Sequence, residues 1–444
     1  MGGCRCLGLS VAWLSPMVDL ILPVGIVPTG ASATTETPVS LPKSIALIQG
    51  HIPHYRIQLF AALETEAARR GYRLTVYSGD QTAPKALPFS HRRFPVHRLG
   101  NDTSGPFWME GLAQAVAGSD IIIAPHGVQC LTIPYLWLQR TRLCSSWIWW
   151  GHGYNFQATT QTSISQWFTT TVKNFLLMRG DGVITYTHGG AQYWCDRGLS
   201  AERVAPFFNT IDVEGLQETG RQVTDRQLAE ARERLGLGGK QVLLFSGRLY
   251  AEKQVDFLLQ AFAKVQHVRP DTALLILGDG QERGRLEELR RSLDLHDVHF
   301  LGELTDPRDT SIYFKLAQLL AIPGLVGLAI VHGFAFNLPL ITTERPFHSP
   351  EIEYLSKDNG SMTAHDPDAY ATEIARILSS PEDLNTMQRH CHESARRLTL
   401  AASAKRFMQA VVQFSAPAES VTSDRRRSQR TSFSSPAITT SMRR

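Results

Sequence analysis

The chain has 444 residues, of which 43% are hydrophobic and 19% charged, a composition that excludes a wholly disordered, collagen-like or coiled-coil protein. This length accommodates two cores of ~150–200 residues each. The formal net charge of +4 equals the charge of residues 415–444 alone, where six arginines outnumber two acidic residues. The rest of the chain is neutral overall, which argues against a nucleic-acid partner.

The ends of the chain differ in composition from its body. Residues 7–33 are apolar and end in small residues, as a signal peptide does, but Asp19 interrupts the run and only Arg5 supplies positive charge. We interpret residues 1–43 as a disordered N-terminal extension and residues 417–444 as a disordered basic tail. The six cysteines show no metal-ligand spacing and no apolar run reaches about 18 residues. We therefore expect a reduced, cytoplasmic protein without a metal, with peripheral contact to the inner face of a membrane as an open alternative.

Short apolar runs alternate with amphipathic segments in the first half of the chain. Strands are predicted at 45–48, 74–77, 121–124, 147–150 and 182–185, and helices at 55–70, 135–142 and 164–178. Continuous apolar runs are typical of parallel strands that are buried on both faces. This alternation predicts a parallel α/β sheet with helical crossovers.

The same alternation restarts in the second half. Strands are predicted at 242–245, 274–277, 298–301, 319–322 and 340–342, and helices at 255–265 and 283–293 and within 366–414. Units of ~20–30 residues fit a doubly wound sheet. We predict an α/β protein with two Rossmann-like domains at 44–208 and 209–395, followed by a C-terminal helix at 396–416.

The segment with the clearest chemistry is Phe245–Lys253, between a predicted strand and a predicted helix. Its cations Arg248 and Lys253 would lie beside the positive end of the helix dipole, which suits a diphosphate. Solvated loop charges are the alternative interpretation.

Glycine-arginine, three residues and then glutamate-lysine resembles the donor-phosphate motif of the family-4 glycosyltransferases, which have two facing Rossmann-like domains (the GT-B fold). Four further segments resemble family motifs in the family's order: Asn209–Asp212, Leu277–Gly280, Phe300–Gly302 and Ala335–Ile341. The resemblance implies transfer of a sugar from a nucleotide-sugar donor to a saccharide, lipid-linked or polysaccharide acceptor, with retention at the anomeric carbon. It implies no cofactor and no required metal.

The resemblance also implies roles for single residues of the second domain. Arg248 and Lys253 would bind the donor diphosphate and stabilise it as it leaves, because preorganised cations lower the barrier for a departing anion. Gly247 and Gly278 would belong to the donor-binding turns.

One loop departs from the family pattern. The family has two glutamates eight residues apart, and this chain has Gly324 and His332 at those positions, while Gly327 and Leu328 fit the pattern. The loop resembles that of a bacterial subgroup. An imidazole can hydrogen-bond a hydroxyl, so we expect His332 to contact the donor, with a half-buried helix residue as the alternative.

Glu351 follows Pro350 at the start of a predicted helical turn. It would either contact donor hydroxyls in place of the missing carboxylates, or be an acid favoured by the helix dipole.

In the first domain, His54 and Arg56 follow the first strand and are candidates for acceptor or phosphate contact, although a plain surface loop is equally compatible. His152 lies between Gly151 and Gly153, whose lack of side chains lets a ligand approach closely. The resemblance places a histidine here near the anomeric centre, so we expect His152 to be the main catalytic residue of this domain. A structural histidine is the alternative.

Tryptophans cluster near two arginines: Trp137, Trp147, Trp149 and Trp150 with Arg140 and Arg142. They suit lipid headgroups or sugar stacking, but the predicted strand at 147–150 favours core packing. The basic run at 91–93 would add weak, salt-sensitive attraction to a membrane, or be solvated.

Two other functions stay open. A nucleotide-sugar 2-epimerase shares the fold but needs groups for proton abstraction in the cleft. A degenerate nucleotide-binding subunit of a polysaccharide assembly would explain the missing glutamates, although the presence of Arg248 and Lys253 argues against it.

Overall fold

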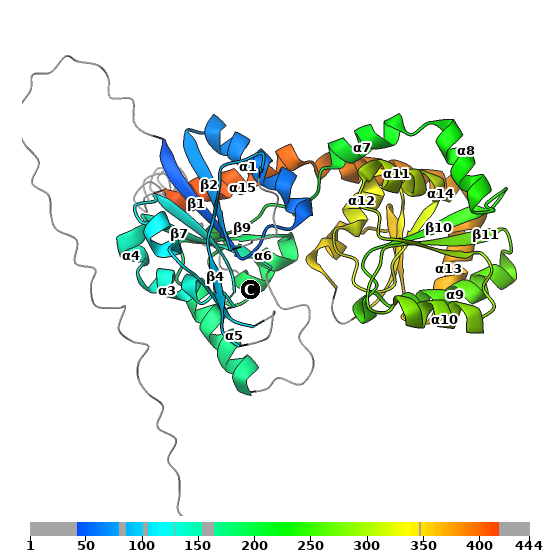
Figure 1. Cartoon of the computed structure of the whole chain (residues 1–444), viewed down its shortest axis with the longest axis horizontal. Helices are drawn as coiled ribbons and strands as arrows, with labels where there is room; N and C mark the ends of the chain where they lie inside the picture. Colours follow the sequence, from blue (N-terminus) through cyan, green and yellow to red (C-terminus); the bar gives the residue numbers. More distant parts are fainter. Residues whose placement is uncertain are drawn as a thin grey trace, which may run out of the picture. The chain divides into compact units, whose positions relative to one another are not determined.

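The computed structural model describes residues 42–79, 86–100, 105–127, 129–152, 164–345 and 348–416, with side chains omitted at 164–169. The predicted N-terminal extension, apart from its last two residues, and the predicted basic tail lie outside the described residues. The described chain forms two parallel sheets and one separate two-stranded ribbon (Figure 1).

The first sheet has the strand order β3-β2-β1-β6-β7-β8-β9, and every neighbouring pair is parallel. Its strands are β1 (Lys43–Gln49), β2 (Tyr72–Ser78), β3 (His91–Arg93), β6 (Ile121–Pro125), β7 (Ser146–Gly151), β8 (Gly182–Thr185) and β9 (Val204–Pro206). The antiparallel ribbon pairs β4 (Val96–Arg98) with β5 (Phe107–Met109).

Both faces of the first sheet are covered, which explains the continuous apolar strands. In β1, Ile45 and Leu47 belong to one core, whereas Ala46 and Ile48 belong to the other. The helices of this half are α1 (Ile57–Arg69), α2 (Leu112–Val116), α3 (Thr132–Leu138), α4 (Arg140–Leu143), α5 (Ile164–Leu177) and α6 (His188–Cys195), with short 3-10 turns η2 (His54–Arg56) and η3 (Ala201–Arg203).

The last helix, α15 (Leu400–Ser415), packs beside α1 and contributes Phe407, Met408 and Val411 to the core of the first sheet. The C-terminal segment therefore returns to the N-terminal half, a packing that sequence periodicity did not predict. The strand tryptophans pack in the cores as well, because Trp147, Trp149 and Trp150 are all at most 2% exposed.

The second sheet has the order β12-β11-β10-β13-β14-β15, again with parallel pairs throughout. Its strands are β10 (Gln241–Ser246), β11 (Thr272–Leu277), β12 (Val298–Gly302), β13 (Leu319–Ala321), β14 (Leu340–Thr343) and β15 (Gly360–Thr363). The order reverses at β10, as in doubly wound nucleotide-binding folds, where ligands bind beyond the carboxyl ends of the strands.

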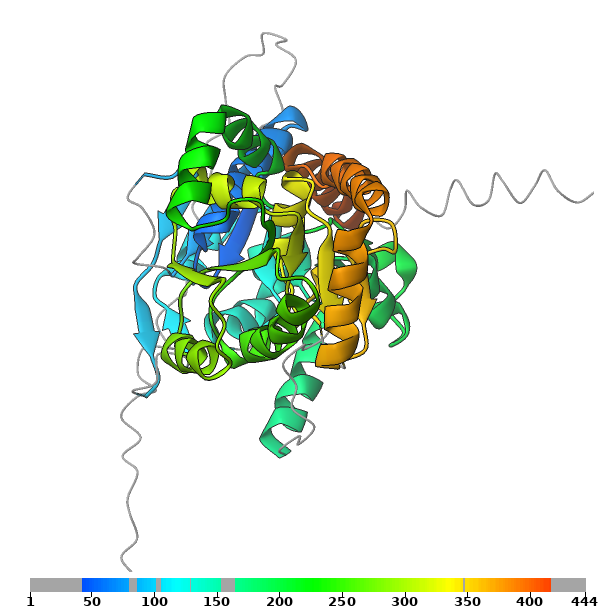
Figure 2. The ribbon, with the colours of Figure 1, turned by 90° about the vertical axis from the view of Figure 1, so that its right-hand side faces the viewer.

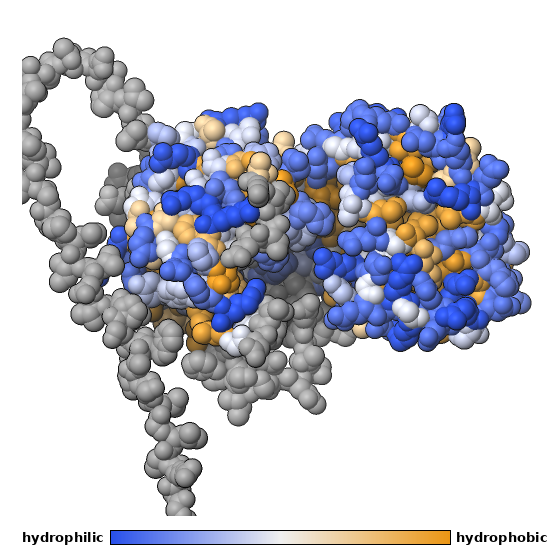
Figure 3. All heavy atoms as spheres, in the orientation of Figure 1, coloured by the Kyte–Doolittle hydropathy of each residue, from blue (hydrophilic) through white to orange (hydrophobic). Residues whose placement is uncertain are grey.

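Helices cover both faces of this sheet (Figure 2). They are α7 (Val213–Gln222), α8 (Asp225–Arg234), α9 (Val255–Val268), α10 (Arg283–Ser292), α11 (Pro307–Leu316), α12 (Ala329–Ala335), α13 (Pro367–Ser379) and α14 (Pro381–Arg397), with 3-10 turns η4 (Ala251–Lys253) and η5 (Pro350–Tyr354). The described surface of this half is mainly hydrophilic in Figure 3, with small hydrophobic areas between.

Every predicted strand coincides with an observed one, and the α/β prediction is confirmed. The predicted helix at 135–142 is two short helices, because the chain leaves helical geometry at Gln139. Residues 396 and 397 complete α14 rather than beginning the C-terminal helix. Within the described residues, no helix has the length and hydropathy to cross a membrane.

Candidate functional site: the carboxyl ends of the two sheets

The loop after β10 carries Gly247, Arg248 and, in η4, Lys253. Gly247 has φ +155°, and the N–H of Gly247 donates to Leu277 O at 3.0 Å. A Cβ at Gly278 would lie 2.0 Å from Gly247 O, so the turns after β10 and β11 touch only because glycine occupies position 278. These two glycines thus set the backbone of the predicted donor loop.

Lys253 points from η4 toward the loop after β13. Its Nζ donates to Leu325 O and, at 3.3 Å, to Val326 O. The N–H of Leu325 donates back to Glu252 O at 3.0 Å, so two reciprocal contacts hold the loops together. Burial lowers the pKa of Lys253 to about 8, while the charge of Glu351 acts in the opposite direction. The ammonium is therefore mostly protonated at pH 7 and loses its proton in the range around pH 8.

Gly324, at the position where the family pattern has a glutamate, is tightly enclosed by backbone atoms. A Cβ at this position would lie 2.2 Å from Glu252 O and 2.5 Å from the carbonyl carbon and oxygen of Lys253. All three atoms are backbone, which cannot swing aside as a flexible side chain can. In this backbone arrangement position 324 has no room for any side chain.

Beside these loops lies a cavity of about 420 Å³, which we call the donor cavity. It is lined by Tyr250, Ala251, Glu252, Lys253, Gln281, Glu282 and Leu325. Arg248 is exposed and is outside this lining, but its Nη1 donates to the hydroxyl of Tyr250 at 2.8 Å. Both predicted phosphate-binding cations therefore lie at this edge of the sheet. Lys253 lines the donor cavity itself, and Arg248 contacts the cavity residue Tyr250.

Glu351, on η5, is a buried carboxyl at 4% exposure. Its Oε1 accepts from Asn209 Nδ2 at 2.7 Å. Burial raises the pKa of Glu351, and the hydrogen bond from Asn209 and the charges of Arg56 and Lys253 partly oppose this. Glu351 therefore lies within electrostatic reach of one cation from each half of the chain.

Two neighbours of Glu351 fix the position of η5. Tyr354 donates its hydroxyl proton to Asn209 O at 2.9 Å. Glu353 Oε1 accepts from Thr187 Oγ1 at 2.8 Å and from the N–H of Gly189 at 2.6 Å, at the start of α6. These contacts tie η5 to the first half and so set where the carboxyl of Glu351 lies.

Arg56 is held on the first sheet by three groups. Its Nη1 donates to Gln49 Oε1 at 3.2 Å, its Nη2 donates to the hydroxyl of Tyr186, and its guanidinium carbon lies 4.9 Å from the ring centroid of Trp150. Its Nε is buried without a hydrogen-bond partner among the described residues. His54 is exposed and contacts the ring of Tyr55 edge-on.

His152 lies at the end of β7, with its ring centroid 4.1 Å from that of Tyr186. Desolvation by surrounding protein, and then the charge of Arg56, lower the pKa of His152 to about 4, although the side chain is exposed. The imidazole is therefore neutral at pH 7 and suited to hydrogen bonding rather than to donating a proton as an imidazolium. The structure groups His152 with Arg56 through Tyr186; Gly153 lies outside the described residues.

His332 lies on α12 and stacks on Phe314, with ring centroids 3.9 Å apart and an interplanar angle of 11°. Burial lowers its pKa to about 4, and its Nε2 has no hydrogen-bond partner among the described residues. His332 is not among the described residues that line the donor cavity. The contacts of His332 match the alternative interpretation, a half-buried helix residue. Gly327 and Leu328 lie in the loop that leads into α12, and the N–H of Gly327 donates to Ser349 Oγ.

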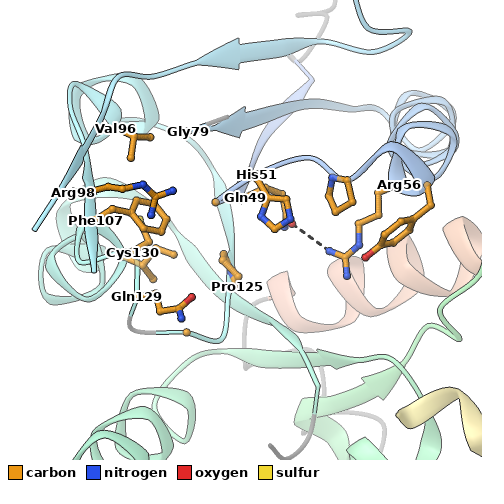
Figure 4. A pocket seen from close by; sticks show the side chains of 15 residues that line it. Gln49, His51, Arg56, Gly79, Val96, Arg98, Phe107, Pro125, Gln129 and Cys130 are labelled. Atoms are coloured by element: carbon orange, nitrogen blue, oxygen red, sulfur yellow. Dashed lines mark hydrogen bonds between the residues drawn. The ribbon is translucent and has the colours of Figure 1, made fainter. Parts of the chain in front are cut away.

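A larger cavity of about 780 Å³, which we call the first-sheet cavity, opens at the carboxyl ends of β1, β2 and β6 (Figure 4). Its polar lining residues include Gln49, His51, Arg56, Arg98 and Gln129. Sequence analysis identified Arg56 but missed the others. Gln49 directly follows the predicted strand at 45–48 and was detectable, whereas Arg98 lies on a three-residue strand without a periodicity signal.

Among the described residues, no group of three or more His, Cys, Asp or Glu side chains converges as metal ligands would.

Comparisons with known proteins agree with this geometry. A family described as "Glycosyl transferases group 1" matches residues 228–397. An exopolysaccharide phosphotransferase of Streptomyces coelicolor is 30% identical over 171 residues, which cover 37% of this chain and 18% of that protein. A GDP-mannose-dependent alpha-(1-6)-phosphatidylinositol dimannoside mannosyltransferase of Mycobacterium tuberculosis is 28% identical over 175 residues, 39% of this chain and 43% of that protein. The chain thus matches less than half the length of either relative.

Solved structures match more of the chain. HepE of Anabaena, crystallised with UDP, aligns with 83% of this chain and 99% of its own at a TM-score of 0.65 and 16% identity. This similarity confirms the predicted GT-B fold.

Proposed function

We propose that this chain, whose residues 228–397 match the family described as "Glycosyl transferases group 1", transfers a sugar from a nucleotide-sugar donor to a saccharide or lipid-linked acceptor. The observation that carries the proposal is Lys253, a partly buried ammonium at a strand–helix turn beside the donor cavity. Arg248 adds a second cation on the same loop. The solved structure of HepE with UDP supports a nucleotide donor.

In the proposed reaction, an acceptor hydroxyl oxygen forms a bond to the anomeric carbon while the bond from that carbon to the diphosphate oxygen breaks. Negative charge grows on the leaving diphosphate, and Lys253 and Arg248 stabilise it more in the transition state than in the bound donor. The acceptor attacks from the face that the diphosphate leaves, which gives retention. The departing phosphate oxygen takes the acceptor's proton on that face, so no strong protein base is needed. No metal or cofactor is required, because the two cations neutralise the leaving group.

The other grouped residues act on the sugar in this proposal. His152, neutral at pH 7, would hydrogen-bond the transferred sugar. Glu351, buried and hydrogen-bonded to Asn209, would favour the charged form of Lys253 through its own charge. Arg56 would face the acceptor from the first sheet.

The test is a thermal-shift panel of nucleoside diphosphates and nucleotide sugars on the wild-type chain and on Lys253→Met. A ligand at 100 times its Kd stabilises the folded state by about 2.7 kcal/mol, which shifts the melting temperature by several degrees. Lys264→Met is the matched control, because Lys264 lies outside the donor cavity and pairs with Asp368 at 2.6 Å. Stabilisation that is lost in Lys253→Met and kept in Lys264→Met supports the site. Stabilisation without turnover on any nucleotide sugar would favour the binding-subunit alternative.

We also propose that the chain contacts an anionic membrane surface through α3 and α5. Leu138 is 71% exposed and Phe175 is 50% exposed. Arg140 lies 4.1 Å above the ring of Trp137, and Arg179 lies 3.7 Å above that of Phe175. Exposed apolar side chains beside cations suit the headgroup region of a bilayer, and Figure 3 shows hydrophobic atoms at the surface where these helices lie.

Sedimentation with vesicles tests this contact. Binding to vesicles with anionic lipid should exceed binding to neutral vesicles and should weaken in salt. Phe175→Ser should reduce it. If the wild-type chain and Phe175→Ser bind equally to anionic and to neutral vesicles, the proposed contact is contradicted.

A further inference from the structure

The ribbon β4–β5 forms one wall of the first-sheet cavity. Arg98 and Phe107 face each other in the register of this ribbon, and the guanidinium carbon of Arg98 lies 5.5 Å from the ring centroid of Phe107. The ribbon is anchored on the loop after β6, because the N–H of Phe107 donates to Gln129 O and the N–H of Leu131 donates to Phe107 O, both at 2.8 Å. The backbone that carries the ring below Arg98 is thus held at a fixed place on the cavity wall.

Glycines at the strand ends let this ribbon approach the sheet. A Cβ at Gly50 would lie 3.2 Å from the tip of the Phe107 ring, and a Cβ at Gly79 would lie 2.5 Å from Val96 Cγ2. The cavity is therefore bounded by the strand ends on one side and by Phe107 and Arg98 on the other (Figure 4).

The charges of the cavity lining are of one sign. The described lining residues include Arg56 and Arg98 and no carboxylate. Two cations in a partly enclosed cavity, without an acidic neighbour in the lining, raise the local potential for an anion. This cavity therefore differs from the donor cavity, whose lining contains Glu252 and Glu282.

The two arginines differ in their partners. Arg56 is engaged by Gln49 and Tyr186 and stacked near Trp150. Within the described residues, the contact of Arg98 is the ring of Phe107, with no carboxylate or carbonyl as a partner for its guanidinium. A guanidinium supported on one face by an aromatic ring keeps its planar donors available for an oxyanion.

We propose that Arg98 binds an anionic group of the acceptor, a phosphate or a carboxylate on a saccharide, in the first-sheet cavity. That this ligand is the acceptor rests on the proposed glycosyl transfer; the anion site itself rests on the cavity. Apolar and aromatic walls contributed by Val96, Phe107 and Ile133 contact the remainder of the ligand. Arg56 lines the opposite side of the cavity and donates to the hydroxyl of Tyr186, whose ring contacts His152.

The experiment measures binding of glucose 1-phosphate, glucuronate and glucose to the full chain by ligand-observed NMR titration at low ionic strength. We expect the two anions to bind at least about tenfold more tightly than glucose, the scale of one charge-assisted contact. Arg98→Gln should abolish this preference and Arg98→Lys should keep part of it, because lysine retains the charge but not the planar donors. The matched control is Arg92→Gln, which removes an exposed arginine that lies over the rings of Tyr77 and Phe94, outside the cavity lining.

Tighter binding of glucose 1-phosphate than of glucuronate would identify a phosphate as the anionic group of the acceptor, and the reverse order would identify a carboxylate. If Lys253→Met removes anion binding and Arg98→Gln leaves it intact, the anions occupy the donor cavity and the proposal is wrong. Equal affinity of the wild type for glucose and for both anions also overturns it. If nucleotide binding is absent while the preference that depends on Arg98 remains, the glycosyl-transfer proposal fails and the anion site stands.

Discussion

Affinity for a nucleoside diphosphate should fall about tenfold between pH 7 and pH 9, because Lys253 loses its proton in this range. Its pKa is lowered to about 8, so the ammonium is about 90% protonated at pH 7 and about 10% at pH 9. A diphosphate binds the charged form, so binding at pH 9 must first return a proton to the amine. We expect an uptake of about half a proton per diphosphate at pH 8 and about 0.9 at pH 9.

Calorimetry in two buffers of different ionisation enthalpy measures this proton uptake directly. Lys253→Arg is the informative control, because a guanidinium stays charged throughout this range, so the remaining pH dependence reports the nucleotide's own titration. Arg248→Gln should weaken binding by a factor of about ten or more and keep the pH dependence. A wild-type affinity that is flat with pH, without proton uptake, would refute the assignment of Lys253 as a diphosphate ligand.

Three further outcomes follow from single contacts. Gly324→Ala should lower the free energy of unfolding by about 1–3 kcal/mol in denaturant titrations, because its Cβ would lie 2.2 Å from a backbone oxygen, whereas Gly284→Ala has open space and should not. His332→Phe should keep the stacking on Phe314 and remove the loss of stability that histidine causes as pH falls below 6.5, since the folded pKa of about 4 lies below the unfolded value; identical acid melts for both proteins would contradict this. His152→Ala should lower kcat by ~10²-fold with nucleoside diphosphate affinity unchanged, and normal turnover would remove it from the site.

The strands that build the two sheets were predictable because they are buried on both faces. Residues 121–124 and 274–277 are continuous apolar runs, which are typical of parallel strands covered on both faces. The edge strand β3 was not predicted, because it consists of His91, Arg92 and Arg93 and is placed by backbone pairing with β2. Sequence analysis interpreted the same three residues as a basic surface run. The edge strand β12, by contrast, coincides with the predicted strand at 298–301.

The site was partly predictable for a different reason. Gly247, Arg248 and Lys253 are close in sequence, so a local motif locates them together. The grouping of Glu351 with Lys253 and Arg56 joins residues from three distant segments, and no local pattern contains it.

The surroundings of His332 could not be predicted from its position in the sequence. Its spacing from Gly324 places it at the position of the family's second glutamate, but α12 turns the ring toward Phe314. Spacing along a helix specifies a face, whereas the packing of that face depends on residues of other elements.

The most direct test of the central claim is acceptor-dependent release of nucleoside diphosphate from a nucleotide sugar. The full chain is incubated with each donor of a panel and a mixture of neutral and anionic saccharide acceptors, and the nucleotide product is measured. We expect release with at least one donor, an increase on adding acceptor, and a loss of ~10²-fold or more in Lys253→Met. No release above the rate of Lys253→Met with any donor, from a chain that remains folded, would contradict the proposed glycosyl transfer.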